Sequence, residues 1–192
     1  MQRKDLNVPL LLTLVRLCSP LVFPFLIVFL WPIQNELINS FLMIVFLLLG
    51  ATDLLDGYLA RKQNQVTRLG QLLDPIADKF LIVSSLIALQ AVGAMGFFWV
   101  IILILRELFV MALRYVSREH NTTIPVMQWG KVKTWSQIFL ISYLLSPWGN
   151  LYAWPQLLLY YSLLFFTLAT SLYSAYCYYR VCIAGVFGKN EF

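Results

Sequence analysis

The sequence predicts an all-α integral membrane protein with six transmembrane helices, both termini in the cytoplasm and a short amphipathic N-terminal segment. Composition is the first observation behind this fold class. The 192 residues are 60% hydrophobic and 12% charged, and the mean hydropathy is +0.77. One soluble core of this size cannot bury so much apolar surface, so lipid must serve as solvent. The second observation is that Lys and Arg concentrate in alternate breaks between the apolar runs.

Six apolar runs have the length that a membrane helix needs. A hydrocarbon layer about 30 Å thick requires roughly 20 mostly apolar residues per helix. The runs that meet this requirement span residues 9–31, 37–60, 72–95, 97–117, 132–148 and 152–181. We expect residues 1–192 to form a single membrane domain.

The breaks between the runs predict the orientation. Segments 31–36, 90–98 and 147–154 contain no Lys or Arg. The basic residues flank the other breaks and the two ends of the chain: Arg3, Lys4, Arg61, Lys62, Arg68, Arg114, Arg118, Lys131, Lys133, Arg180 and Lys189. Because orientation follows this asymmetry, we expect both termini and both basic loops in the cytoplasm. The same bias accounts for the net charge of +5, so we expect no nucleic-acid partner.

Four of the nine acidic residues fall within 26 positions around the second break. They are Asp53 and Asp56 at the end of one predicted helix and Asp74 and Asp78 at the start of the next. A charge at the centre of a membrane helix costs about 2.5–3.5 kcal/mol, so four together need a cation or a functional reason. Each pair shares one helix face. If the helices face each other, the carboxylates suit Mg²⁺, Mn²⁺ or Ca²⁺ better than zinc.

Small residues lie on the same face as the first pair. Gly57 and Ala60 leave this face bare, so that a flat base or a phosphate could approach the backbone. A groove for helix packing explains them equally well. Arg61 adds a rigid positive charge that suits a phosphate group.

The acids and small residues together fit the pattern D-x2-D-G-x2-A-R-x8-G-x3-D-x3-D from Asp53 to Asp78. This pattern resembles the signature of the CDP-alcohol phosphotransferases. The resemblance implies that Asp53, Asp56 and Asp74 bind two divalent cations, Mg²⁺ or Mn²⁺. It implies that Asp78 is the general base and can also touch a metal. The CDP-binding residues that it implies are Asp56, Gly57, Ala60, Arg61 and Gly70.

A second charged group lies inside the otherwise apolar run 97–117. Glu107 and Arg114 are seven residues apart and can pair, which leaves Arg106 as the charge with the less obvious partner. One interpretation is a Glu–Arg pair that joins two helices, with Arg114 extending to the interface. The other is an anion pocket for a phosphorylated substrate.

A third group, Lys131 and Lys133, begins the fifth predicted helix. Such lysines are typical topology anchors. However, the segment 130–137 resembles the G-K-x-K-T-x-x-Q motif of the family branch that uses glycerol 3-phosphate. Arg106-Glu107 with Arg114 resembles the R-E…R helix of that branch, and residues 7–16 resemble its N-x-P-x-x-L-T-x-x-R opening. The resemblance covers residues 7–137 and implies an acceptor phosphate site formed by Arg106, Arg114, Lys131 and Lys133.

The resemblance therefore predicts an enzyme that transfers the phosphatidyl group of CDP-diacylglycerol to glycerol 3-phosphate. It implies a homodimer, which we expect in the bacterial cytoplasmic (inner) membrane. The distribution of Lys and Arg places the helix ends that carry the aspartates, and so the active site, on the cytoplasmic side. A sister enzyme that uses serine, inositol phosphate or phosphatidylglycerol is the alternative within the family. A divalent-cation transporter is the alternative outside it, because intramembrane acids also line ion paths. Such a path would spread its acids across the membrane, whereas here they gather at one end.

The last third of the chain, residues 138–192, is predicted only as a hydrophobic, aromatic-rich hairpin. Its tyrosines are interpreted as lipid-interface and packing groups. They are Tyr160, Tyr161, Tyr173, Tyr176, Tyr178 and Tyr179.

Overall fold

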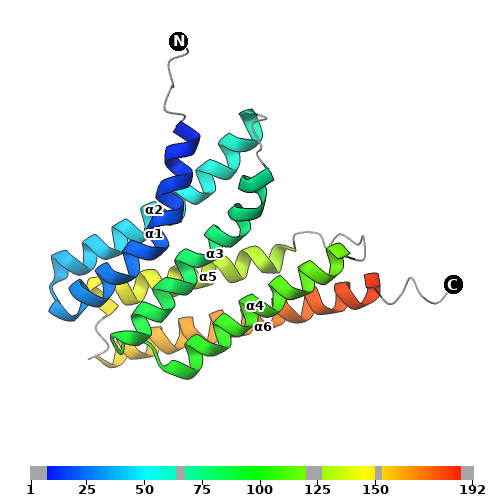
Figure 1. Cartoon of the computed structure of the whole chain (residues 1–192). Coiled ribbons are helices and arrows are strands. Elements are labelled where there is room, and N and C mark those ends of the chain that lie inside the picture. The colour runs from blue at the N-terminus through cyan, green and yellow to red at the C-terminus, as the bar shows by residue number, and fades with distance from the viewer. Residues whose placement is uncertain (1–7, 64–67, 120–126, 150–152, 187–192) are drawn as a thin grey trace, which may run out of the picture. The chain divides into compact units, whose positions relative to one another are not determined.

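The computed structural model describes the backbone of residues 8–63, 68–119, 127–149 and 153–186. Side chains are described in these ranges except for residues 8–17, 52–63, 68–78, 118 and 186. The regular structure of this part is entirely helical (Figure 1). The α-helices are α1 (Val8–Leu30), α2 (Glu36–Gln63), α3 (Arg68–Ala91), α4 (Phe97–Glu119), α5 (Gln128–Leu145) and α6 (Trp154–Val186). Two short 3-10 helices are η1 (Trp31–Ile33) and η2 (Pro147–Gly149).

Each predicted apolar run corresponds to one α-helix, so the all-α part of the prediction is confirmed. The run 72–95 lies on a helix that already begins at Arg68, and α5 begins at Gln128 rather than at residue 132. In both cases the helix extends into the polar segment before the run. Backbone hydrogen bonding continues there, whereas the hydropathy pattern marks only apolar residues.

Membrane-spanning character is clearest for one helix. Among the described residues, Trp154–Gly185 alone is both long and apolar enough to cross a membrane. Shorter apolar helices cover Cys18–Ile33, Glu36–Ala51 and Lys79–Ala91. The count of six spans and the cytoplasmic position of both termini stay predictions, and the N-terminal segment lies outside the described residues.

The chain divides into two compact units, and the single membrane domain stays a prediction. Unit 1 contains residues 1–95 and 141–150. Within it, α1 packs against both α2 and α3. Phe23 of α1 stacks on Phe46 of α2, with ring centroids 5.9 Å apart. Trp31 Nε1 donates a hydrogen bond to the carbonyl oxygen of Leu144 at 3.1 Å. Helix α1 thus holds α2 and α3 in one unit.

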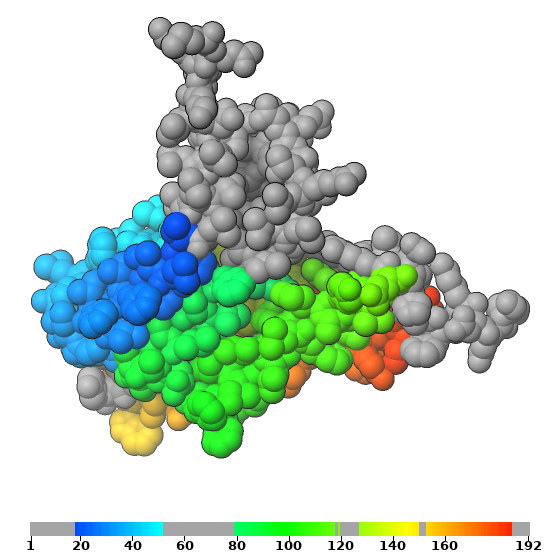
Figure 2. All heavy atoms as spheres, viewed as in Figure 1, coloured from blue at the N-terminus to red at the C-terminus, as the bar shows by residue number. Residues whose placement is uncertain are grey.

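Unit 2 contains residues 96–140 and 151–192. Its helices α4 and α6 lie side by side (Figure 1). Val110, Ala175 and Tyr178 form a buried cluster between them. Other large apolar side chains of α4 face outward, including Phe98 and Leu105, and Figure 2 shows α4 at the surface of the unit. Exposed apolar side chains of this kind are what a lipid-facing helix requires.

Candidate functional site

The four aspartates lie in unit 1, on the last part of α2 and the first part of α3. Residues 64–67 connect the two helices. Asp53 lies ten residues before the end of α2, and Asp78 lies ten residues after the start of α3. At 1.5 Å per residue, both positions are about 15 Å from the connection. Asp56 and Asp74 are likewise at matching depths, about 10 Å from it. Counted along their helices, the two pairs therefore lie at matching distances from the connection.

The side chains of these aspartates lie outside the described residues, as do those of Gly57, Ala60, Arg61 and Gly70. In the part of the chain with described side chains, no three His, Cys, Asp or Glu residues gather into a metal site. The donor set itself fits a hard divalent cation, because four carboxylates provide only oxygen ligands.

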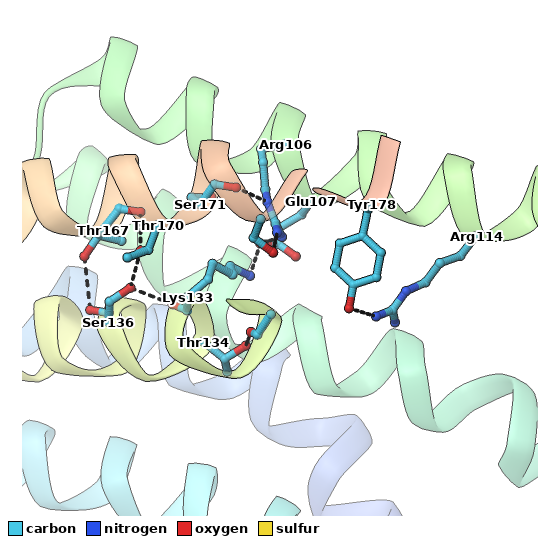
Figure 3. A network of polar contacts seen from close by, with 12 residues as sticks. Arg106, Glu107, Arg114, Lys133, Thr134, Ser136, Thr167, Thr170, Ser171 and Tyr178 are labelled. Carbon is cyan, nitrogen blue, oxygen red and sulfur yellow. Dashed lines mark hydrogen bonds and ion pairs between the residues drawn. The ribbon is translucent and has the colours of Figure 1, made fainter. Parts of the chain in front are cut away.

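Unit 2 contains a buried charged network centred on Arg106 of α4 (Figure 3). Arg106 Nε donates to the carbonyl oxygen of Ser171 at 2.9 Å, and Nη2 donates to Ser174 Oγ at 2.8 Å. Its Nη1 lies 3.2 Å from Glu107 Oε1. Both serines belong to α6, so Arg106 joins α4 to α6 while it contacts a carboxylate.

Glu107 also forms an ion pair with Lys133 of α5. Arg106 is 6% exposed, and Glu107 and Lys133 are each 5% exposed. Two cations share one carboxylate, so the three side chains together carry a charge of +1. The network supplies Arg106 with the partner that the sequence did not make obvious, and it gathers two phosphate-binding cation types from α4 and α5 at one buried carboxylate.

Arg114 lies two turns after Arg106 on α4 and contacts a different side chain of α6. Its Nη2 donates a hydrogen bond to the Tyr178 hydroxyl at 2.8 Å. The guanidinium carbon is 4.9 Å from the centroid of the Tyr178 ring. The interpretation of Tyr178 as a lipid-interface or packing group is therefore incomplete, because its buried hydroxyl bonds to a predicted site residue.

The two lysines of α5 differ in their surroundings. Lys133 is buried against Glu107, whereas Lys131 is exposed. Gln137, one turn after Lys133, is fully buried, and neither polar atom of its amide has a hydrogen-bond partner among the described residues. The structure thus brings Arg106 and Lys133 together through Glu107 and places Lys131 at the surface.

Helix α6 carries a stripe of polar side chains that was not predicted from the sequence. Ser136 Oγ of α5 lies 3.2 Å from Thr170 Oγ1, and Thr167 Oγ1 donates to the Ser136 carbonyl oxygen at 3.2 Å. Figure 3 shows these contacts beside those of Arg106. The sequence pattern that could have predicted this stripe is the spacing i, i+3, i+4, i+7, i+11, which places five polar residues on one face of an apolar helix. The stripe consists of Thr167, Thr170, Ser171, Ser174 and Tyr178.

Comparison with known proteins identifies relatives over most of the chain. The family described as CDP-alcohol phosphatidyltransferase matches residues 6–172. A protein of Haemophilus influenzae named CDP-diacylglycerol–glycerol-3-phosphate 3-phosphatidyltransferase is 38% identical over 151 residues, which is 75% of this chain and 78% of that protein. A Blochmanniella floridana protein with the same name is 34% identical over 186 residues, or 94% and 92% of the two chains. A Bacillus subtilis protein with that name is 42% identical over 102 residues, 53% of each chain.

The family match contains both groups of residues described above. It includes the aspartates of α2 and α3 in unit 1 and the Arg106–Glu107–Lys133 network in unit 2. The chain belongs to the CDP-alcohol phosphatidyltransferase family.

Proposed function

We propose that this protein transfers the phosphatidyl group of CDP-diacylglycerol to glycerol 3-phosphate, forming phosphatidylglycerophosphate and CMP during phospholipid biosynthesis. Family membership supports the reaction and the CDP-linked donor. The names of the relatives support both substrates. The observation that carries the choice of acceptor is that two basic side chains, Arg106 and Lys133, converge on Glu107 from different helices, because glycerol 3-phosphate is a dianion.

Asp53, Asp56 and Asp74 would hold two divalent cations, Mg²⁺ or Mn²⁺. When bound, the cations supply charge neutralisation for the diphosphate of the donor and for the departing CMP. The matching distances of the aspartates from the connection between α2 and α3, counted along the helices, support this assignment. The CDP moiety is assigned to Asp56, Gly57, Ala60, Arg61 and Gly70.

Asp78 is assigned as the general base. It accepts the proton of the acceptor hydroxyl while that oxygen forms a bond to the phosphorus of the phosphatidyl group. The bond between this phosphorus and the CMP oxygen breaks, and CMP leaves with the electron pair. A carboxylate suits this role because the hydroxyl becomes a stronger nucleophile as its proton departs.

The phosphate of the acceptor is assigned to Arg106, Arg114, Lys131 and Lys133. Arginine can bind phosphate through two parallel hydrogen bonds, and lysine contributes a point charge. The convergence of Arg106 and Lys133 at Glu107 supports these two residues. Lys131 is exposed, so its charge can attract the water-soluble acceptor before the acceptor enters the site.

We further propose that six helices span the cytoplasmic (inner) membrane of a bacterium, with both termini and the active site on the cytoplasmic side. The apolar helix Trp154–Gly185 and the exposed apolar side chains of α4 support membrane insertion. The alternation of basic and uncharged breaks supports the orientation. A homodimer in contact with membrane lipid completes the proposal.

An acceptor panel tests the proposed function. Purified protein in detergent micelles is given CDP-diacylglycerol, Mg²⁺ and one acceptor at a time, and the release of CMP is measured. We expect rapid release with glycerol 3-phosphate and only background release with serine, inositol phosphate or phosphatidylglycerol. Release with serine but not with glycerol 3-phosphate would assign the protein to a sister activity.

A further inference from the structure

The hydroxyl of Tyr178 joins α4, α5 and α6 of unit 2 at one point. Tyr178 is only 1% exposed, and its ring packs in the apolar cluster with Val110 and Ala175. The hydroxyl oxygen accepts a hydrogen bond from Arg114 Nη2 at 2.8 Å and one from the backbone N–H of Met127 at 3.4 Å. Met127 directly precedes α5. Packing of the ring therefore fixes an oxygen that contacts both Arg114 and the start of α5.

Gly130, in the first turn of α5, approaches the same hydroxyl. A Cβ atom at position 130 would lie 3.0 Å from the Tyr178 hydroxyl oxygen. Few real Cβ contacts are this short, so the oxygen would have to move by a few tenths of an ångström. Because two donors and a packed ring hold it, such a movement would weaken the bond to Arg114. The glycine of the G-K-x-K segment thus leaves room for the Tyr178 hydroxyl.

We propose that Tyr178 is a positioning residue for the acceptor site: it holds the guanidinium of Arg114 at a fixed position relative to the first turn of α5. This inference rests on the proposed function, in which Arg114 and Lys133 bind the phosphate of the acceptor. A guanidinium has five N–H donors, so a bond to Tyr178 leaves others for a phosphate. An arginine held in advance loses less side-chain entropy when the phosphate binds. The hydroxyl should therefore affect acceptor affinity rather than the chemical step.

Steady-state kinetics of full-length Tyr178→Phe test this role, because the variant keeps the ring and removes only the hydroxyl. We expect the KM for glycerol 3-phosphate to rise about tenfold, as expected for the loss of a hydrogen bond to a charged group. The kcat and the KM for CDP-diacylglycerol should change less than about twofold. Tyr179→Phe is the matched control, because Tyr179 is exposed and its ring contacts Phe109. Unchanged KM values in Tyr178→Phe, or an equal loss for both substrates, would overturn the proposal.

Gly130→Ala provides a second test, because its effect on the KM for glycerol 3-phosphate should depend on the Tyr178 hydroxyl. In the wild-type background we expect Gly130→Ala to raise the KM for glycerol 3-phosphate several-fold. In the Tyr178→Phe background the clashing oxygen is absent, so adding Gly130→Ala should change the KM less than about twofold. If the fold-changes in KM of the two single variants multiply in the double variant, the two residues act independently, and this would contradict the proposal.

Thermal unfolding of the same four proteins separates this proposal from the proposed function. The Tm changes should also be non-additive, because the contact between position 130 and the hydroxyl exists without substrate. If wild-type protein releases no CMP with glycerol 3-phosphate, the proposed function fails, and additive Tm changes would then also refute the contact. Non-additive Tm changes combined with an unchanged KM in Tyr178→Phe would reduce Tyr178 to a structural role and overturn its part in acceptor binding.

Discussion

Glu107 is a single buried carboxylate that contacts two buried cations. Arg106 and Lys133 both approach its Oε1 atom, and all three side chains are at most 6% exposed. Breaking a buried pair by removing one partner costs about 3–5 kcal/mol, because the remaining charge stays away from water. Here the removal of the carboxylate would take an ionic partner from two buried cations.

Glu107→Gln should therefore lower the Tm by about 10 °C. Glutamine keeps the shape of the side chain and removes its charge. Thermal unfolding of the purified variant in detergent micelles measures the effect, and Glu119→Gln on the exposed end of α4 is the control. Adding Lys133→Met should restore part of the loss, since one of the two cations that lost this carboxylate is then gone. Equal Tm values for Glu107→Gln and wild type would show that the carboxylate does not compensate the cations.

Asp78→Asn should abolish CMP release while binding of CDP-diacylglycerol stays within about threefold of wild type. The amide cannot accept the proton of the acceptor hydroxyl at neutral pH, so only the chemical step should fail. CMP release and equilibrium binding of the donor are measured on the same preparation. Glu36→Gln, at the other end of α2, is the control and should retain full activity. Loss of donor binding in Asp78→Asn would instead assign Asp78 to the metal or CDP site.

At the scale of elements, the apolar runs predicted six helices, and the structure contains them. The contacts of α6 were not predictable in the same way. Ser and Thr hydroxyls in an apolar helix commonly bond to the carbonyl one turn earlier, as Thr170 Oγ1 does with Phe166 O at 2.9 Å. Sequence alone cannot show that the same hydroxyl also meets Ser136 of α5, because the choice of partner helix depends on packing.

Ser174→Ala tests whether the polar stripe of α6 stabilises unit 2. Ser174 is fully buried and accepts a hydrogen bond from Arg106 Nη2 at 2.8 Å. Loss of a bond to a buried charged group should cost about 1.5–3 kcal/mol. Ser162→Ala is the control on the same helix, because that exposed hydroxyl bonds only to the carbonyl of Leu159 in the described structure. Equal Tm values for the two variants would mean that the stripe does not bear on stability.

For the whole molecule, the Asp53–Asp78 pattern and the basic segments predicted the family that the comparisons show. The sequence could not predict that Glu107 joins Arg106 to Lys133, since those two cations lie on different helices. It also could not predict which lysine of α5 is buried. The positions of the two lysines along α5 do not decide which one is buried, because that depends on how α4 and α6 pack against α5. The assignments of the aspartates rest on their pattern and helix register.

Reporter fusions test the predicted orientation of the whole chain. Green fluorescent protein attached after Phe192 should fluoresce, and alkaline phosphatase at the same place should be inactive, because the C-terminus is expected in the cytoplasm. Fusions after Gln34, in a break without Lys or Arg, should give the opposite pair of results. Active alkaline phosphatase after Phe192 would contradict the predicted topology.

The identity and amount of the lipid product test the proposed reaction most directly. Wild-type protein in micelles is incubated with CDP-diacylglycerol, glycerol 3-phosphate and Mg²⁺, and lipid and CMP are quantified together by mass spectrometry. We expect one phosphatidylglycerophosphate for each CMP, and neither product when EDTA replaces Mg²⁺ or when glycerol 3-phosphate is omitted. Release of CMP without phosphatidylglycerophosphate, or full activity in EDTA, would contradict the proposed reaction.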